Sequence, residues 1–199
     1  MINGPQKQGL YDPRNEHDAC GVGFVADVKG RRSHEIVRNA LEVLRNLEHR
    51  GASGCDANSG DGAGILIQTP HDFLQRECSF ELPAFGQYAV GMVFLPVAVS
   101  SRIRCEAILE QIVEEEGQHV LGWRDVPTND SMLGPTARES RPIVRQIFIA
   151  QNENLNDDAA FERKLYVIRR RAVRKVKRSN IDGFTSRVSR TRPSSTKEC

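Results

Sequence analysis

The chain has 199 residues, of which 39% are hydrophobic and 27% charged, a composition typical of folded globular proteins rather than disordered or fibrous ones. No apolar run approaches the roughly 20 residues of a membrane-spanning helix, and the polar first 19 residues lack the apolar stretch of a secretory signal. We therefore expect a cytoplasmic protein that makes no contact with a membrane.

The predicted elements follow from the spacing of apolar residues. In chain order they are a buried strand over 21–28, a helix over 33–49, strands over 65–69 and 88–95, a helix from about 100 to 117, strands over 119–126 and 143–150, and a helix that begins at 157 or 158. The glycine-rich residues 51–64 predict a loop. This order of strands and helices fits an α/β layered domain.

The net charge of +2 conceals an uneven distribution along the chain. Residues 1–160 carry 15 Lys and Arg against 23 Asp and Glu, a net charge of −8, whereas residues 161–199 carry 13 against 3, a net charge of +10. Such a split is compatible with a nucleic-acid-binding tail or with a basic helix on an acidic body. Because no aromatic residue accompanies the basic run 169–178 beyond Tyr166, stacking on bases has little support, and we expect no nucleic-acid partner.

Cys20 is the candidate nucleophile of this sequence. The five cysteines show neither the close pairing of a zinc or redox motif nor the even number of a disulfide framework, so a special cysteine must act alone. Cys20 lies between a polar leader and an apolar run. If the Ala19–Cys20 bond were cut, its α-amino group, with a pKa of about 7.7–8.0, could take the proton of its own thiol. The alternative is a small core residue.

The segment NEHDACGVGFVADVKGRRSHEIVRNALEVLRNLEHRGASGCDANSGDGAGILIQTP, residues 15–70, closely resembles the start of the glutamate synthase large subunit. The first domain of that subunit is a class II glutamine amidotransferase. LGWRDVPTND (121–130) and RQIFIA (145–150) resemble its next blocks, in the same order. The resemblance extends from about Tyr11 to Phe184.

The resemblance implies an α+β fold, the four-layer αββα arrangement of N-terminal-nucleophile (Ntn) hydrolases, here incomplete. Residues 1–19 match a propeptide-like leader, and residues 20–184 match the N-terminal part of the amidotransferase domain. Cys20 matches the catalytic nucleophile. Arg50 matches an arginine near it, which would position the cysteine or the substrate.

The implied reaction is hydrolysis of L-glutamine to glutamate and ammonia. In complete members of the family, a synthase domain with FMN and an iron–sulfur cluster uses this ammonia to aminate 2-oxoglutarate reductively. Electrons come from an NAD(P)H-oxidising small subunit or from ferredoxin. We expect no cofactor and no metal in this chain, and we expect the fragment to be inactive alone, because the family's oxyanion hole and substrate clamp lie downstream.

Residues 185–199 show no periodicity and predict a disordered, out-of-frame tail. Family members continue after the phenylalanine that matches Phe184 with a segment containing Ile-Val-Tyr-Lys-Gly-Met, and a one-base shift of a plausible coding for it reads as residues 194–199. Resequencing the gene around the Phe184 codon tests this expectation.

Two other functions are compatible with the residues alone. One is a class II amidotransferase that delivers ammonia to another acceptor, such as a sugar phosphate; residues 123–128 resemble the synthase and make this alternative weaker. The other is a non-enzymatic protein that binds nucleic acid through its basic C-terminal region. Binding to DNA or RNA whose affinity falls steeply with salt concentration would favour this alternative.

Overall fold

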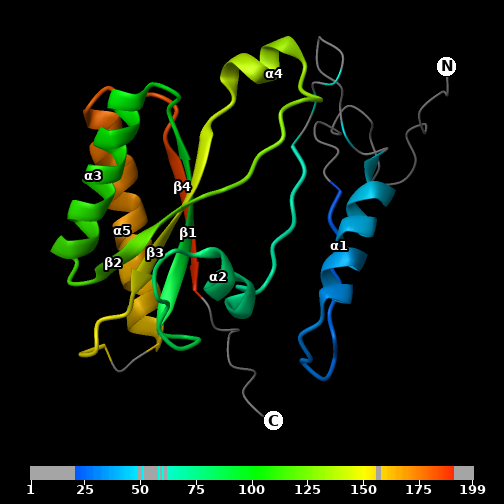
Figure 1. The fold of residues 1–199 in the computed structure, drawn as a ribbon, viewed down its shortest axis with the longest axis horizontal. Coiled ribbons are helices and arrows are strands. Elements are labelled where there is room, and N and C mark those ends of the chain that lie inside the picture. The colour runs from blue at the N-terminus through cyan, green and yellow to red at the C-terminus, as the bar shows by residue number, and fades with distance from the viewer. Residues whose placement is uncertain are drawn as a thin grey trace, which may run out of the picture. The chain divides into compact units, whose positions relative to one another are not determined.

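The computed structural model describes residues 21–48, 51, 58, 60, 62–155 and 158–190, without the side chains of 158 and 187–190. The chain forms two compact units (Figure 1). Unit 1 comprises Met1–Leu66 and Leu133–Thr136, and unit 2 comprises Ile67–Met132 and Ala137–Cys199. Among the described residues, no helix combines the length and the apolar character needed to cross a membrane.

Unit 2 is built on a four-stranded antiparallel sheet in the order β2-β3-β1-β4 (Figure 1). Its strands are β1 (Tyr88–Leu95), β2 (His119–Asp125), β3 (Ile143–Ala150) and β4 (Thr185–Arg190). β1 and β3 pair along their whole length. The predicted bounds of these two strands are confirmed. Because neighbouring strands are antiparallel, the unit is α+β, and the α/β arrangement suggested by the order of elements is wrong.

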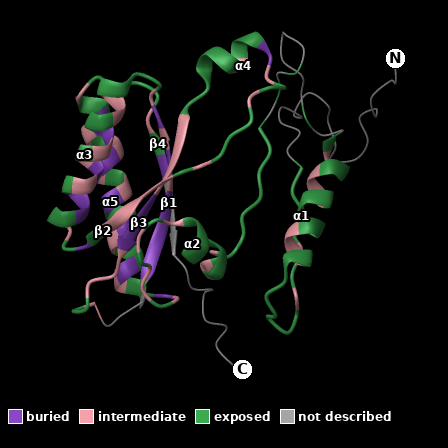
Figure 2. Cartoon of the chain, in the orientation of Figure 1, coloured by how far each residue is buried: buried purple, intermediate pink, exposed green. Residues whose placement is uncertain are grey.

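One face of this sheet is covered by two helices, α3 (Val99–Glu115) and α5 (Asp158–Arg178), which lie side by side (Figure 1). Alternate strand residues point into the core between sheet and helices, where side chains are fully buried (Figure 2). They meet the apolar stripe of α5, whose members are Phe161, Leu165, Ile168, Ala172 and Val176. The predicted helix that begins at 157 or 158 is confirmed. Gly117, with φ +73°, ends α3 as predicted.

The other face of the sheet carries a smaller core. Tyr88, Val90 and Phe148 are buried there with Leu74 of α2 (His71–Glu77). Burial raises the pKa of the Tyr88 hydroxyl to about 12, and that hydroxyl lies 2.9 Å from Nδ1 of His71. Neither α2 nor α4 (Pro135–Ser140) was predicted, because helices this short leave little periodicity to detect.

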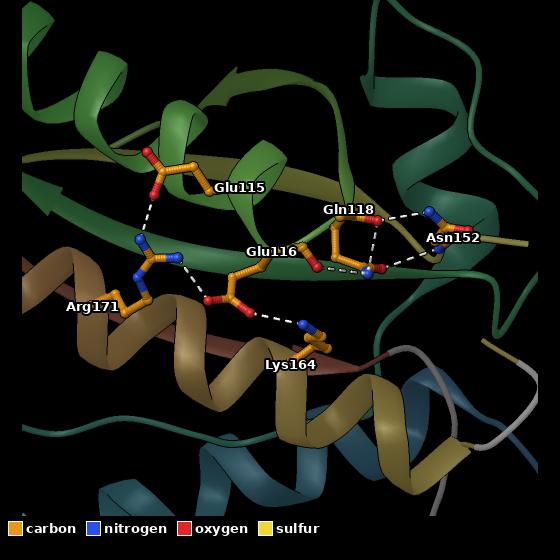
Figure 3. Close-up of polar contacts among 7 residues, drawn as sticks. Glu115, Glu116, Gln118, Asn152, Lys164 and Arg171 are labelled. Carbon is orange, nitrogen blue, oxygen red and sulfur yellow. Dashed lines mark hydrogen bonds and ion pairs between the residues drawn. The ribbon is translucent and has the colours of Figure 1, made fainter. Parts of the chain in front are cut away.

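The basic helix α5 is partly neutralised by glutamates at the end of α3 (Figure 3). Lys164 and Arg171, two turns apart on α5, hold the two carboxylate oxygens of Glu116 at 2.8 and 2.7 Å. Arg171 also pairs with Glu115. The hydrogen bonds from Lys164 and then Arg171 lower the pKa of Glu116. At these residues the structure supports the interpretation of a basic helix that packs on acidic residues.

Two predicted strands are not formed. Residues 21–28 and 65–69 lack a strand ladder, and large apolar side chains on them are exposed: Phe24 is 92% and Leu66 93% exposed. Both runs are apolar enough for a buried strand. A strand, however, also needs a neighbouring strand to bond its backbone, and among the described residues neither run forms a ladder with such a neighbour. The prediction of buried strands is therefore wrong for these residues.

The prediction of disorder is wrong for residues 185–190, which form β4 along one edge of β1. Backbone hydrogen bonds do not depend on side-chain type, so this polar segment can complete the ladder without an apolar pattern of its own. Residues 191–199 lie outside the described residues. The out-of-frame origin of 185–199 stays a prediction.

Ser186 shows that the sequence of β4 is poorly matched to its place. Its side chain is 4% exposed, opposite Val93 in the register, and its Oγ has no hydrogen-bond partner. A buried hydroxyl without a partner costs about 1–3 kcal/mol. We therefore expect Ser186→Ala to raise the free energy of unfolding by about 1 kcal/mol. Urea unfolding followed by Trp123 fluorescence measures it.

Thr185→Ala is the matched control for this substitution, because Thr185 is the exposed neighbour on the same strand. It should leave the unfolding free energy within about 0.5 kcal/mol of the parent. A Ser186→Ala variant less stable than the Thr185→Ala variant would contradict the assignment of Ser186 as an unsatisfied core residue.

Candidate active site

Both predicted site residues, Cys20 and Arg50, lie outside the described residues. Their described neighbours, Gly21 and Gly51, belong to unit 1. The described part of the candidate site is therefore the extended segment 21–28, the turn after it, and helix α1 (His34–Asn46).

Helix α1 begins as the sequence predicts. Ser33 is its N-cap, and the Ser33 hydroxyl accepts a hydrogen bond of 3.1 Å from the backbone N–H of Glu35. Its apolar residues recur at helical spacing, but the helix ends at Asn46, before the predicted residue 49.

A tight turn reverses the chain between segment 21–28 and α1. Asp27 organises this turn: its carboxylate accepts hydrogen bonds from the backbone N–H groups of Lys29 and Arg31, at 2.8 and 3.2 Å, and from the Arg31 guanidinium. The bonds from Arg31 lower the pKa of Asp27. Gly30 has φ +67°, a conformation that favours glycine. The reversal lets segment 21–28 run back along α1 (Figure 1).

Segment 21–28 meets α1 at Gly23. A Cβ atom on Gly23 would lie 2.5 Å from Cγ1 of Val43, closer than real Cβ contacts. Val25 and Asp27, two and four residues on, are half-buried, whereas Val22 and Phe24 are about nine-tenths exposed. One side of the extended segment thus lies against α1 and the other is an uncovered row of apolar side chains.

Residues 123–125, part of the block that resembles the synthases, have a structural role in unit 2. Trp123 donates from Nε1 to Glu110 of α3 at 2.6 Å, and Asp125 accepts from Nε of Arg145 at 2.6 Å. Arg124 donates instead to Gln146, at 3.0 Å, and to Glu77 of α2. These contacts hold β2 to β3 and to both helices. They give the block no chemistry of its own.

Arg145 lies at the centre of this network, and its role was not predicted from the sequence. Its guanidinium lies over the Trp123 ring, 5.2 Å from the centroid, and also binds Glu106 of α3 at 2.7 Å. A single arginine inside the apolar run of β3 is the signal that could have revealed it, because a charge in a buried strand needs partners.

The described donor groups do not fit an iron–sulfur cluster, which needs several cysteine thiolates close together. Cys105 is buried in the core under α3 and α5, whereas Cys78 packs against the smaller core on the opposite face of the sheet. Burial raises the pKa of both thiols. The described ranges hold no group of three or more His, Cys, Asp or Glu able to bind a metal.

A comparison with family models matches residues 20–191 to the class II glutamine amidotransferases. The chain belongs to this family. The match begins at Cys20 and continues through β4. Several curated proteins similar to this chain are glutamate synthases.

Three of these relatives come from a bacterium, a yeast and a plant. The chain is 48% identical over 169 residues to the glutamate synthase [NADPH] large chain of Bacillus subtilis, covering 84% of this chain and 11% of the relative. It is 41% identical over 180 residues to the glutamate synthase [NADH] of Saccharomyces cerevisiae, covering 84% and 8%. It is 41% identical over 172 residues to ferredoxin-dependent glutamate synthase 1 of Arabidopsis thaliana, covering 83% and 10%. The chain spans about a tenth of the length of these relatives.

Proposed function

We propose that this chain supplies the glutamine-hydrolysing part of a glutamate synthase, with Cys20 as the nucleophile. The observation that carries the proposal is the family match, which begins at Cys20 itself. Removal of residues 1–19 adds water across the Ala19–Cys20 bond and leaves Cys20 with a free α-amino group. That amine sits beside the thiol and can accept its proton.

The reaction then proceeds in two steps. The Cys20 thiolate attacks the carboxamide carbon of L-glutamine, and ammonia leaves with the proton taken from the thiol. Water next attacks the γ-glutamyl thioester, which releases glutamate and restores the thiol. The sum is glutamine plus water giving glutamate plus ammonia.

Arg50 is proposed to position the cysteine or the substrate. The contact between Gly23 and Val43 supports this role, because it places the segment that follows Cys20 against the helix that precedes Arg50. An arginine close to a thiolate also favours the charged form of the thiol.

We propose that the complete domain has the four-layer αββα arrangement. Unit 2 supports it with one sheet whose first face is covered by α3 and α5. Unit 1 supports it with an extended segment that has α1 on one side and the exposed side chains of Val22, Phe24 and Val28 on the other. In the complete domain, we expect this apolar row to be buried between two stacked sheets.

The ammonia is proposed to pass to a synthase domain that aminates 2-oxoglutarate reductively in the cytoplasm. The relatives named for NADPH, NADH and ferredoxin indicate the classes of electron donor that such an enzyme uses. The donor partner would be an NAD(P)H-oxidising small subunit or ferredoxin.

The proposal is tested with a chimera that joins residues 1–184 to the downstream part of the Bacillus subtilis relative. A glutamine analogue with a diazoketone group reacts covalently with a catalytic thiol. We expect mass spectrometry to find one label, on a new N-terminal Cys20, and to find Cys78 and Cys105 unlabelled, because burial keeps these two thiols protonated. A label on Cys78 or Cys105 with Cys20 free would refute the assignment.

A further inference from the structure

The basic helix α5 carries cations on two sides, and α3 covers one of them. Lys164 and Arg171 donate to the Glu116 carboxylate at 2.8 and 2.7 Å (Figure 3). Lys175, about one turn further along α5, donates to Gln111 at 2.7 Å. Because residues later on α5 meet residues earlier on α3, the two helices run antiparallel. One side of α5 is thus already bound by a helix that presents carboxylate and amide oxygens.

A second set of cations lies on the side of α5 that faces away from the core. Arg170, Arg174 and Lys177 are exposed. At about 3.6 residues per turn, their spacing of four and then three residues places them on one side of the helix, opposite the buried Ala172 and Val176. Within the described part of the chain, these three side chains form no hydrogen bond and no ion pair. In this they differ from the cations that face α3.

Two partly apolar side chains continue this side of α5 toward its N-terminus. Tyr166 and Val167 are 57% and 37% exposed, about one turn before Arg170. The Arg169 guanidinium lies over the Tyr166 ring, 5.4 Å from its centroid, so one face of the ring is occupied. Residues 163–178 include no Asp or Glu. The outer face of α5 is therefore basic with an apolar end, and it consists of Tyr166, Val167, Arg170, Arg174 and Lys177.

We propose that the outer face of α5 is a docking surface for an acidic helix from outside this chain, lying along α5 as α3 does on the neighbouring side. Carboxylates on one side of such a helix would meet Arg170, Arg174 and Lys177, and arginine binds a carboxylate through two parallel hydrogen bonds. Apolar residues of the same helix would pack on Val167. A phosphate backbone could pair with the cations, but it offers nothing apolar to pack there. The inference concerns what the domain contacts, so it does not depend on the role of Cys20.

The test measures binding of labelled peptides to the full chain by fluorescence anisotropy at low ionic strength. The one-sided peptide is alanine-rich, about 20 residues long so that it can form a helix, and carries glutamates at i, i+4, i+7 and i+11 with a leucine beside them. The spread peptide has the same composition, with its glutamates distributed around the helix. Arg170→Gln with Arg174→Gln removes two cations of the outer face. Arg76→Gln with Arg104→Gln is the matched control, because both arginines are exposed and lie on other helices.

The parent should bind the one-sided peptide more tightly than the spread peptide. Each exposed charge pair contributes about 1.5- to 5-fold, so the chain with Arg170→Gln and Arg174→Gln should bind roughly 2- to 25-fold more weakly. The control chain should stay within about 1.5-fold of the parent, because its lost cations lie away from the surface. A chain with Arg170→Glu and Arg174→Glu should prefer a one-sided peptide that carries lysine in place of glutamate.

Three results would overturn the inference. The first is equal binding of the one-sided and spread peptides. The second is equal weakening in the chain with Arg170→Gln and Arg174→Gln and in the control chain, which would indicate attraction by overall charge alone. The third is tighter binding of a short DNA duplex, or of phosphatidylserine vesicles, than of the one-sided peptide, with that binding lost in the variant of the outer face. This result would assign the surface to a nucleic acid or a membrane instead.

Discussion

Replacing Cys20 by alanine should abolish glutamine hydrolysis in the chimera of residues 1–184 with the Bacillus subtilis downstream sequence. Alanine has no group that can attack the carboxamide, so no thioester forms. Loss of a catalytic nucleophile typically costs on the order of 10⁴–10⁶ in rate. The measurement is ammonia released from glutamine at saturating substrate, with glutamine binding followed separately by calorimetry to show that the site is still formed.

Cys78→Ala is the control for this change, because it removes a thiol of the same chain that has no proposed role. Cys78 is half-buried and its pKa is raised by burial, so it contributes little thiolate at neutral pH. The Cys78→Ala chimera should keep hydrolysis within about threefold of the parent, as expected for a change outside the reacting groups. Ammonia release by the Cys20→Ala chimera at a comparable rate would exclude Cys20 as the nucleophile.

Replacing Phe148 by alanine should have the largest effect on stability. Phe148 is fully buried at the centre of the smaller core, with its ring 5.2 Å from Phe80 in an edge-to-face arrangement and 6.3 Å from Tyr88. Removing a buried phenylalanine ring leaves a cavity and typically costs about 3–5 kcal/mol. Urea unfolding measures this loss, and the fluorescence of Trp123, the only tryptophan, reports on unit 2 alone.

Phe73→Ala is the corresponding control on α2, a residue of the same type in the same unit. Its side chain is 43% exposed, and it contacts the Arg124 guanidinium from one side of the ring. It should cost about 1 kcal/mol or less. Equal losses for Phe148→Ala and Phe73→Ala would contradict the assignment of Phe148 to the centre of the smaller core.

The sequence predicts best the elements whose start and end signals are local. β1 and β3 are apolar runs whose observed bounds equal the predicted ones, and β1 is closed by Pro96. The start of α1 was predictable because Ser33 supplies its own cap. In each case the residues that start or end the element lie within it or directly beside it in the sequence.

Elements that depend on a distant partner were predicted poorly. Segment 21–28 has the composition of a strand but remains unpaired in the described structure, whereas β4 has a polar composition and is paired. The difference lies in the neighbour: the edge of β1 is available to β4 and offers the backbone groups that complete its ladder. No pattern within six residues of sequence carries that information.

The sequence allowed the candidate nucleophile to be predicted, but not the contacts of the residues around it. Cys20 stands out because a leader, a cysteine and an apolar run follow one another, a local signal. The Gly23–Val43 contact joins residues twenty apart, and the Arg145 network joins residues from α3, β2 and β3. Such contacts exist only after the chain reverses and pairs, so their partners had to come from the structure.

Because β1 pairs with β3, the sheet cannot form during synthesis until β3 has been translated. Roughly 50 residues, β2 among them, separate the end of β1 from the start of β3, which takes about 2–10 s of translation at 5–20 residues per second. Throughout this interval the apolar strand YAVGMVFL has both edges open. A nascent chain that stalls before β3 is made exposes the unpaired edges of β1 to pairing with other chains. Binding of a chaperone at this stage would protect the chain most from aggregation.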